Sequence, residues 1–138
     1  MFSGKQKVAF LALTIYLFLS VLSYYPFYLS YFNELVWDRK YAYKYLADSN
    51  VDWRQGKYYL DAYLSAHPNA VYMPDQPRSG TIIVPVNFLV GTARDSSQLY
   101  KWLRDNFQPT DTIAYEYLVF NISPQQLQQL CAHTDYCH

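Results

Sequence analysis

The sequence predicts an α+β fold, with a single N-terminal transmembrane helix followed by a small mixed α/β extracytoplasmic domain of three to four strands. Three observations predict it. Residues 8–33 carry no charged side chain, and 8–22 are almost wholly apolar. Beyond them, amphipathic helical patterns alternate with β-branched apolar runs. The 138 residues leave room for one anchor and one domain. We expect the anchor, with its cytoplasmic tip, over 1–27 and the domain over 28–138.

The anchor is predicted from the length of the apolar segment. A helix that crosses the hydrocarbon core needs about 20 predominantly apolar residues, and the segment reaches that length before Phe27, among tyrosines typical of a membrane interface. Lys5 and Lys7 predict a cytoplasmic N-terminus, which puts the domain outside, in a periplasmic or extracellular location. A signal peptide cleaved after Ser23 is the alternative. The apolar character continues past that position, which favours the anchor.

The first half of the domain contains one clear amphipathic pattern. Leu60, Tyr63 and Leu64 would share a face of a helix over 54–66. We also expect a tyrosine-rich helical turn at 41–46, a short strand at 70–73 and a loop over 74–80, where prolines and a glycine recur.

The second half contains the strongest strand signals. Residues 81–90 predict a strand that Pro85 confines to a sheet edge or a bulge. Residues 112–122 predict an unbroken strand with alternating buried positions. The pairs Asp95/Gln98 and Ser123/Gln126 resemble capping boxes, so we expect helices over 95–107 and from 123 onward. The expected buried stripe of the first of these helices is Leu99, Trp102, Leu103 and Phe107.

An acidic segment, Asp48-Ser49-Asn50-Val51-Asp52, separates the first two helical patterns. Its alternating oxygen ligands resemble the opening of a calcium loop. An EF-hand is excluded, because Trp53 stands where the loop needs glycine and Tyr59 where it needs glutamate. A looser divalent-ion site is the alternative. We predict no metal site and interpret the segment as a structural turn in which Asp52 caps the following helix and Trp53 packs on Leu60 or the neighbouring sheet.

The other candidate polar residues lie near the predicted membrane interface and at the C-terminus. Asn33 and Glu34 could hydrogen-bond a lipid headgroup, a sugar or their own domain, and we favour the last. Cys131 and Cys137 could form a disulfide or, with the histidines at 133 and 138, bind zinc. The spacing does not match common zinc sites, so the disulfide is favoured, as expected outside the cytoplasm.

Composition and motifs exclude several functions. The formal net charge is zero, which disfavours nucleic-acid binding. The sequence contains no Gly-rich phosphate loop, no G-x-S-x-G and no nucleophile with an identifiable base. We accordingly predict no catalytic residue and no cofactor. Sixteen tyrosines suit membrane lipid, protein contacts or glycan stacking.

Two motifs carry a resemblance to a known family. YPFYLSYFNEL at 25–35 and DSNVDW at 48–53, the latter followed by Gln55, resemble the C-terminal part of polyprenyl-phosphate-dependent glycosyltransferases. These are the mannosyltransferase-like members of the C superfamily, related to protein O-mannosyltransferases. The similarity extends weakly through 84–89, 100–103 and 113–115, although Arg54 replaces a usual glycine.

The resemblance implies the end of a last membrane helix and the start of an extracytoplasmic domain. Family members carry many membrane helices and an acidic catalytic loop near the first, neither of which is present here. The chain is therefore expected to be a truncated, split or free-standing C-terminal domain that is not catalytic alone. Its expected partners are membrane lipid, a polytopic glycosyltransferase subunit and a glycan. The expected contact residues are Asn33, Glu34, Asp48, Asn50, Asp52, Trp53 and Gln55. The alternatives are a non-catalytic glycan- or peptide-binding module and a structural subunit of a membrane complex.

Overall fold

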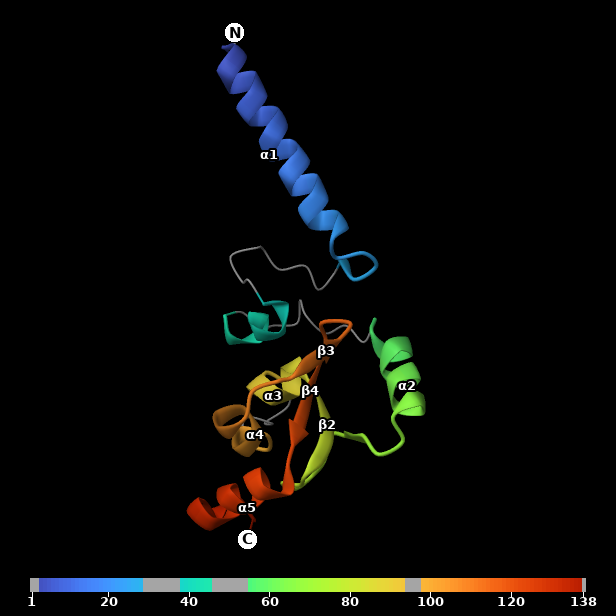
Figure 1. Ribbon diagram of the computed structural model, residues 1–138, viewed down its shortest axis with the longest axis vertical. Helices are drawn as coiled ribbons and strands as arrows, with labels where there is room; N and C mark the ends of the chain where they lie inside the picture. The colour runs from blue at the N-terminus through green and yellow to red at the C-terminus, as the bar shows by residue number, and fades with distance from the viewer. Residues whose placement is uncertain (1–2, 29–37, 46–54, 94–97, 138) are drawn as a thin grey trace.

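Figure 1 shows the computed structural model, which describes residues 3–28, 38–45, 55–93 and 98–137. A long helix precedes a small domain built on a four-stranded sheet. The elements are α1 (Gly4–Leu22), η2 (Arg39–Lys44), α2 (Lys57–Ala66), β1 (Val71–Tyr72), β2 (Gly80–Pro85), α3 (Val86–Val90), α4 (Lys101–Asn106), β3 (Asp111–Ile113), β4 (Tyr117–Ile122), α5 (Pro124–His133) and η3 (Asp135–Cys137). The predicted mixed class, with four strands and one N-terminal apolar helix, is confirmed.

Helix α1 projects away from the domain, and its apolar side chains are exposed (Figure 1). Phe10 is 73% and Phe18 64% exposed, on a helix of 19 residues. At 1.5 Å per residue its length is about 28 Å, close to the roughly 30 Å hydrocarbon core of a bilayer. It is the one helix within the described residues that is long and apolar enough to cross a membrane.

The sheet has the order β1-β2-β4-β3. β1 pairs with β2 in parallel, whereas β2 and β3 both pair antiparallel with β4. The central pair is in register at Ile83 and Val119. β2 and β4 are therefore the interior strands, and both consist largely of buried residues.

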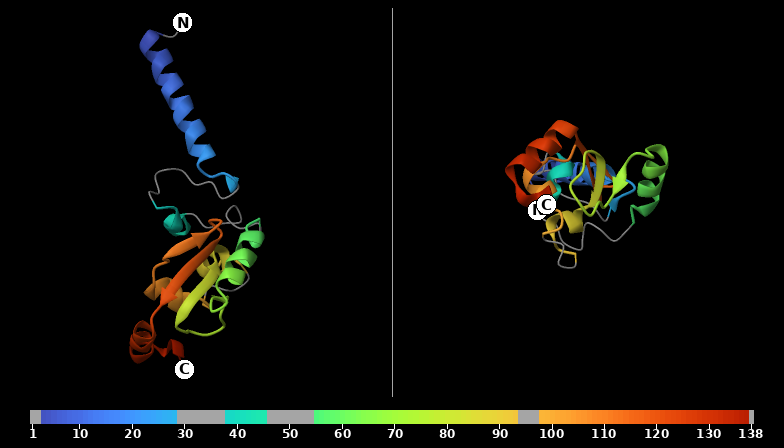
Figure 2. Two further views of the ribbon diagram at one scale, coloured as in Figure 1. Left: turned by 45° about the vertical axis from the view of Figure 1, so that its right-hand side comes forward. Right: turned by 90° about the horizontal axis from the view of Figure 1, so that it is seen from below.

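Helices cover both faces of the sheet. Because successive side chains of a strand point to opposite sides, each face has its own hydrophobic cluster. On one face Ile83 and Val119 pack in a cluster with Leu60 of α2. On the other face the alternate residues pack with α3, α4 and α5 (Figure 2). That larger cluster contains Ile82, Val84, Leu118, Phe120 and Ile122 from the strands and Leu89, Trp102, Leu103 and Leu130 from the helices.

The predicted strand over 81–90 is wrong in its second half, and its predicted position at the edge of the sheet is also wrong. β2 ends at Pro85, and the next five residues form α3. Pro85 is paired opposite Tyr117 and ends the strand, so a proline lies on an interior strand without interrupting its ladder. The following amide, that of Val86, donates to the Glu116 carbonyl oxygen at 2.9 Å.

The predicted strand over 112–122 is also wrong, because a turn divides it into β3 and β4. The predicted helix over 95–107 contains α4, which begins at Lys101 after Tyr100, a residue that makes no side-chain cap. Asp95, the predicted cap, lies outside the described residues. Leu99 is 41% exposed and does not belong to the buried stripe. Trp102 and Leu103 are buried as expected.

Helix starts were predicted with mixed success. The capping box of α5 is present, since the Ser123 hydroxyl accepts from the Gln126 amide at 3.2 Å and the Gln126 side chain accepts from the Ser123 amide at 2.9 Å. Asp52, the predicted cap of α2, lies outside the described residues, but the predicted start of this helix at position 54 is wrong. Gly56 is the N-cap, and the helix begins at Lys57, three residues later than expected.

Cys131 and Cys137 form the predicted disulfide, with their Cα atoms 5.4 Å apart. The zinc alternative is wrong, because the bond uses both thiols. The bond ties the short η3 to the last turns of α5.

Removing this disulfide should lower stability moderately. The two cysteines are separated by 6 positions, and closing a loop of that size stabilises the folded chain by about 2 kcal/mol through the unfolded state. The double variant Cys131→Ser/Cys137→Ser should therefore lose about that free energy of unfolding, measured by urea titration in detergent. Reductant should destabilise the wild type equally and leave the double variant unchanged. A double variant with the same free energy of unfolding as the oxidised wild type would contradict the expectation.

Candidate functional site

Most of the predicted contact residues lie outside the described residues. This applies to Asn33, Glu34, Asp48, Asn50, Asp52 and Trp53. Gln55 is described, is half-buried and directly precedes Gly56. The candidate site is therefore built from what surrounds Gln55 and Gly56.

Gly56 lies against a buried carboxylate. Its amide donates to Oε2 of Glu116 at 2.8 Å, and the Glu116 side chain is completely buried, at 0% exposure. A buried carboxylate is costly unless it accepts hydrogen bonds, so this contact is essential to the local fold. Glu116 was not predicted as a site residue, although it is the one charged residue between 112 and 122. An isolated acid inside an apolar run is the signal that could have found it.

Glycine is required at position 56 for space. A Cβ atom there would lie 2.7 Å from Glu116 Oε2 and 2.8 Å from the Ala114 Cβ. Both distances are shorter than Cβ contacts found in proteins. The backbone of Gly56 itself is ordinary, with φ −82° and ψ 0°. The close approach of two backbone segments, and not a special dihedral angle, therefore selects glycine.

The turn between β3 and β4 has an unusual backbone. Ala114 and Tyr115 both have positive φ, 52° and 58°, and the Glu116 amide donates to the Ile113 carbonyl at 3.1 Å. Two consecutive positive φ values are those of a type I′ hairpin turn, which favours Asn and Gly. Each residue here pays about 1–2 kcal/mol for the left-handed conformation. The neighbouring contacts must hold the turn in place.

Aromatic rings supply those contacts and join the turn to the end of α1. The Tyr115 ring centroid lies 5.3 Å from that of Tyr24 and 5.8 Å from that of Phe27. The Phe27 ring also packs edge-on against Tyr59 of α2, at 4.7 Å. Tyr24 is 2% exposed. These separations are typical of favourable aromatic pairs, worth about 0.5–1.5 kcal/mol each.

We call this arrangement the anchor junction. It consists of Tyr24, Phe27, Gly56, Tyr59, Ala114, Tyr115 and Glu116. Three segments far apart in the sequence meet there: the residues after α1, the start of α2 and the β3–β4 turn. Gln55 and Gly56, which follow the DSNVDW motif and Arg54 in the sequence, lie at this junction.

The junction is suited to positioning and not to acid–base catalysis. Its carboxylate is buried and accepts a backbone hydrogen bond. Within 3–28, 38–45, 55–93 and 98–137, no three His, Cys, Asp or Glu residues lie together in a way that could hold a metal ion. The chemical consequence of the geometry is a fixed attachment between the apolar helix and the domain.

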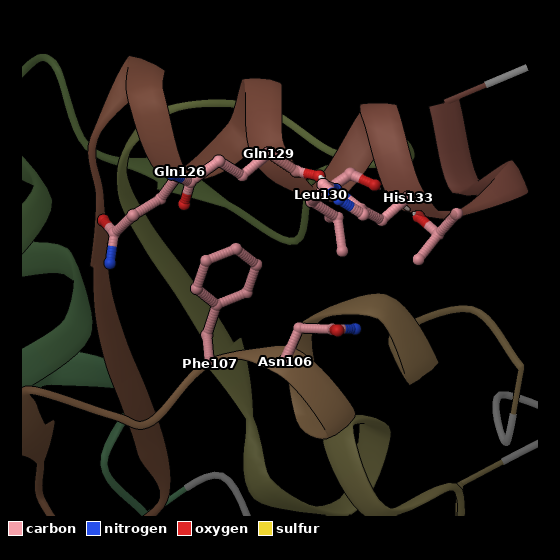
Figure 3. Close-up of a pocket in the computed structure, with 7 residues that line it drawn as sticks. Asn106, Phe107, Gln126, Gln129, Leu130 and His133 are labelled. Carbon is pink, nitrogen blue, oxygen red and sulfur yellow. Dashed lines mark hydrogen bonds between the residues drawn. The ribbon is translucent and has the colours of Figure 1, made fainter.

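A second feature is a groove at the opposite end of the domain, between α4 and α5 (Figure 3). Its volume is about 320 Å³, and the Phe107 ring lies between the two helices. Leu130 also lines the groove, and the remaining lining side chains are polar: Asn106, Gln126, Gln129, His133 and Thr134. The Asn106 side-chain amide donates a hydrogen bond to the Trp102 carbonyl oxygen at 2.8 Å, and this bond orients the Asn106 side chain. Amide groups around an aromatic ring can hydrogen-bond and stack on a small polar ligand.

Comparisons of the chain with models of known families, with curated proteins and with solved structures found no match. The resemblance to glycosyltransferases stays a prediction from its two motifs.

Replacing Gly56 tests the close packing of the junction. In Gly56→Ala the added methyl group must displace Glu116 or Ala114, and overpacking of this kind costs about 1–3 kcal/mol. Thermal unfolding in detergent should show a melting temperature several degrees below that of the wild type. Gly4→Ala is the matched control, because no atom lies within 4 Å of its added methyl group. Equal melting temperatures for Gly56→Ala and the control would contradict the packing described here.

Proposed function

We propose that the chain is a membrane-anchored accessory domain of a lipid-linked-sugar glycosyltransferase and does not transfer sugar alone. It would hold part of a polytopic partner, or the acceptor of that partner, at the membrane surface. The anchor junction is the observation that supports this proposal, because it attaches the domain directly to the end of an apolar helix of membrane-spanning length.

The junction also holds the start of α2, which follows the DSNVDW segment in the sequence. The Gly56 amide is hydrogen-bonded to the Glu116 carboxylate, and Tyr59, in the first turn of α2, packs on Phe27. The start of α2 therefore lies at the end of the domain nearest α1 (Figure 1). A partner embedded in the same membrane would meet this end first.

The proposed orientation has a cytoplasmic N-terminus and an extracytoplasmic domain. Lys5 and Lys7 precede the apolar stretch, which favours this orientation by the positive-inside bias. The Cys131–Cys137 disulfide also favours an oxidising compartment for the domain.

A non-catalytic glycan-binding module is the second candidate function. The groove of Figure 3 favours it, because Gln126, Gln129 and Asn106 present amides around the Phe107 ring. This function requires the chain to bind a glycan without a partner, whereas the first requires a polytopic subunit. Glycan binding by the purified chain therefore distinguishes the two.

The orientation predicts selective proteolysis. In right-side-out vesicles or spheroplasts, added protease should digest the domain and leave an N-terminal tag beside Lys5 and Lys7 intact. Detergent should expose both, which controls for protease activity. Protection of the domain in sealed vesicles, together with cleavage of the tag, would show that the proposed orientation is wrong.

The partner can be tested by photocrosslinking in intact membranes. We would introduce p-benzoylphenylalanine at Gln55, next to the junction, and at Gln125, an exposed residue of α5 at the far end of the domain. Position 55 should crosslink a polytopic membrane protein that transfers sugar from a polyprenyl-phosphate donor, and position 125 should not. The purified chain should show no transfer with the same donor. Turnover by the pure chain, or position 55 adducts that contain no such enzyme, would overturn the proposal.

A further inference from the structure

Exposed tyrosines gather where α1 meets the domain. Tyr25 is 73%, Tyr28 44%, Tyr58 76% and Tyr59 39% exposed. We call these four residues the tyrosine rim. Two come from the segment after α1 and two from the first turn of α2.

The rim is continuous with the anchor junction. The Tyr25 and Tyr28 rings lie 6.0 Å apart, and the Tyr58 and Tyr59 rings 5.5 Å apart. Phe27 joins the two pairs, because its ring lies 4.7 Å from that of Tyr59. The start of α2 is thus held beside the residues that follow the apolar helix.

We infer that the tyrosine rim is a lipid-binding surface, through which the first turn of α2 lies in the headgroup layer of the bilayer that α1 crosses. The inference rests on the membrane anchoring in the proposed function. A tyrosine ring is apolar with a polar tip, so it is stabilised where hydrocarbon meets water.

The position of the rim along α1 favours lipid as its occupant. The length of α1, about 28 Å, nearly fills a hydrocarbon core of about 30 Å. Tyr25 and Tyr28 follow its last turn and therefore fall at the boundary of that core. Because Tyr59 contacts Phe27 and Tyr58 is its neighbour, both reach the same layer.

The direction of α2 limits how much of the domain enters this layer. Figures 1 and 2 show the start of α2 at the end of the domain nearest α1 and the rest of the helix leading away from it. Ser65 lies seven positions after Tyr58, hence on the same face and about 10 Å further along the axis. One headgroup layer is about 5–8 Å thick, so Tyr58 should lie in it and Ser65 in water.

Two nitroxide labels on this one face of α2 test the inference. Tyr58→Cys and Ser65→Cys replace exposed residues, and the native cysteines are unavailable to the label because they form a disulfide. The full chain would be reconstituted in phosphatidylcholine vesicles, and accessibility to oxygen and to a water-soluble nickel chelate measured by electron paramagnetic resonance. We expect the oxygen-to-nickel ratio to be several-fold higher at position 58 than at 65.

A third label separates failure of the inference from failure of the anchor. Leu13→Cys reports on the middle of α1, where the native side chain is 56% exposed. A lipid-shielded label at 13 with equal ratios at 58 and 65 overturns the lipid-binding rim and leaves the anchor intact. An aqueous label at 13 overturns the anchor and the rim together.

Discussion

The hydrogen bond between the Gly56 amide and the Glu116 carboxylate determines how the start of α2 meets the β3–β4 turn. A buried carboxylate is stable only with such donors, and the donor reaches it only because position 56 has no side chain. The same contact places the start of α2, with Gln55 just before it, at the end of the domain nearest α1.

This constraint also explains a turn with unfavourable dihedral angles. Ala114 and Tyr115 adopt left-handed conformations that neither side chain favours. Tyr115 contacts Tyr24 and Phe27 there, while Glu116 is directed to Gly56. Strain in the turn is thus offset by contacts that attach the domain to the end of α1. Both α2 and the turn contact the residues that follow α1, through Tyr59 and Tyr115.

Local signals predicted the parts of the fold that local physics determines. The α5 start was predicted because Ser123 and Gln126 satisfy each other's backbone amides. The disulfide was predicted because the cysteine spacing does not match common zinc sites and a domain outside the cytoplasm favours the bond. The β3–β4 turn was missed because Ala and Tyr are not residues that favour such a turn, and residues distant in the sequence hold it in place. The interior position of Pro85 was missed for a similar reason, since the proline ends its strand and interrupts no ladder. For the candidate site, Gln55 was predicted as a contact residue and lies beside the junction, which was not itself predicted. Glu116 was missed because its partner lies 60 residues away.

Hydrogen exchange at the Gly56 amide tests the central role of this contact most directly. The amide precedes the first turn of α2 and has no partner within the helix, so protection there must come from Glu116. We expect exchange as slow as that of the amides in the interior strand β4, because breaking the hydrogen bond exposes a buried carboxylate. Exchange at the rate of an unprotected amide, in a chain whose β4 amides remain protected, would contradict it.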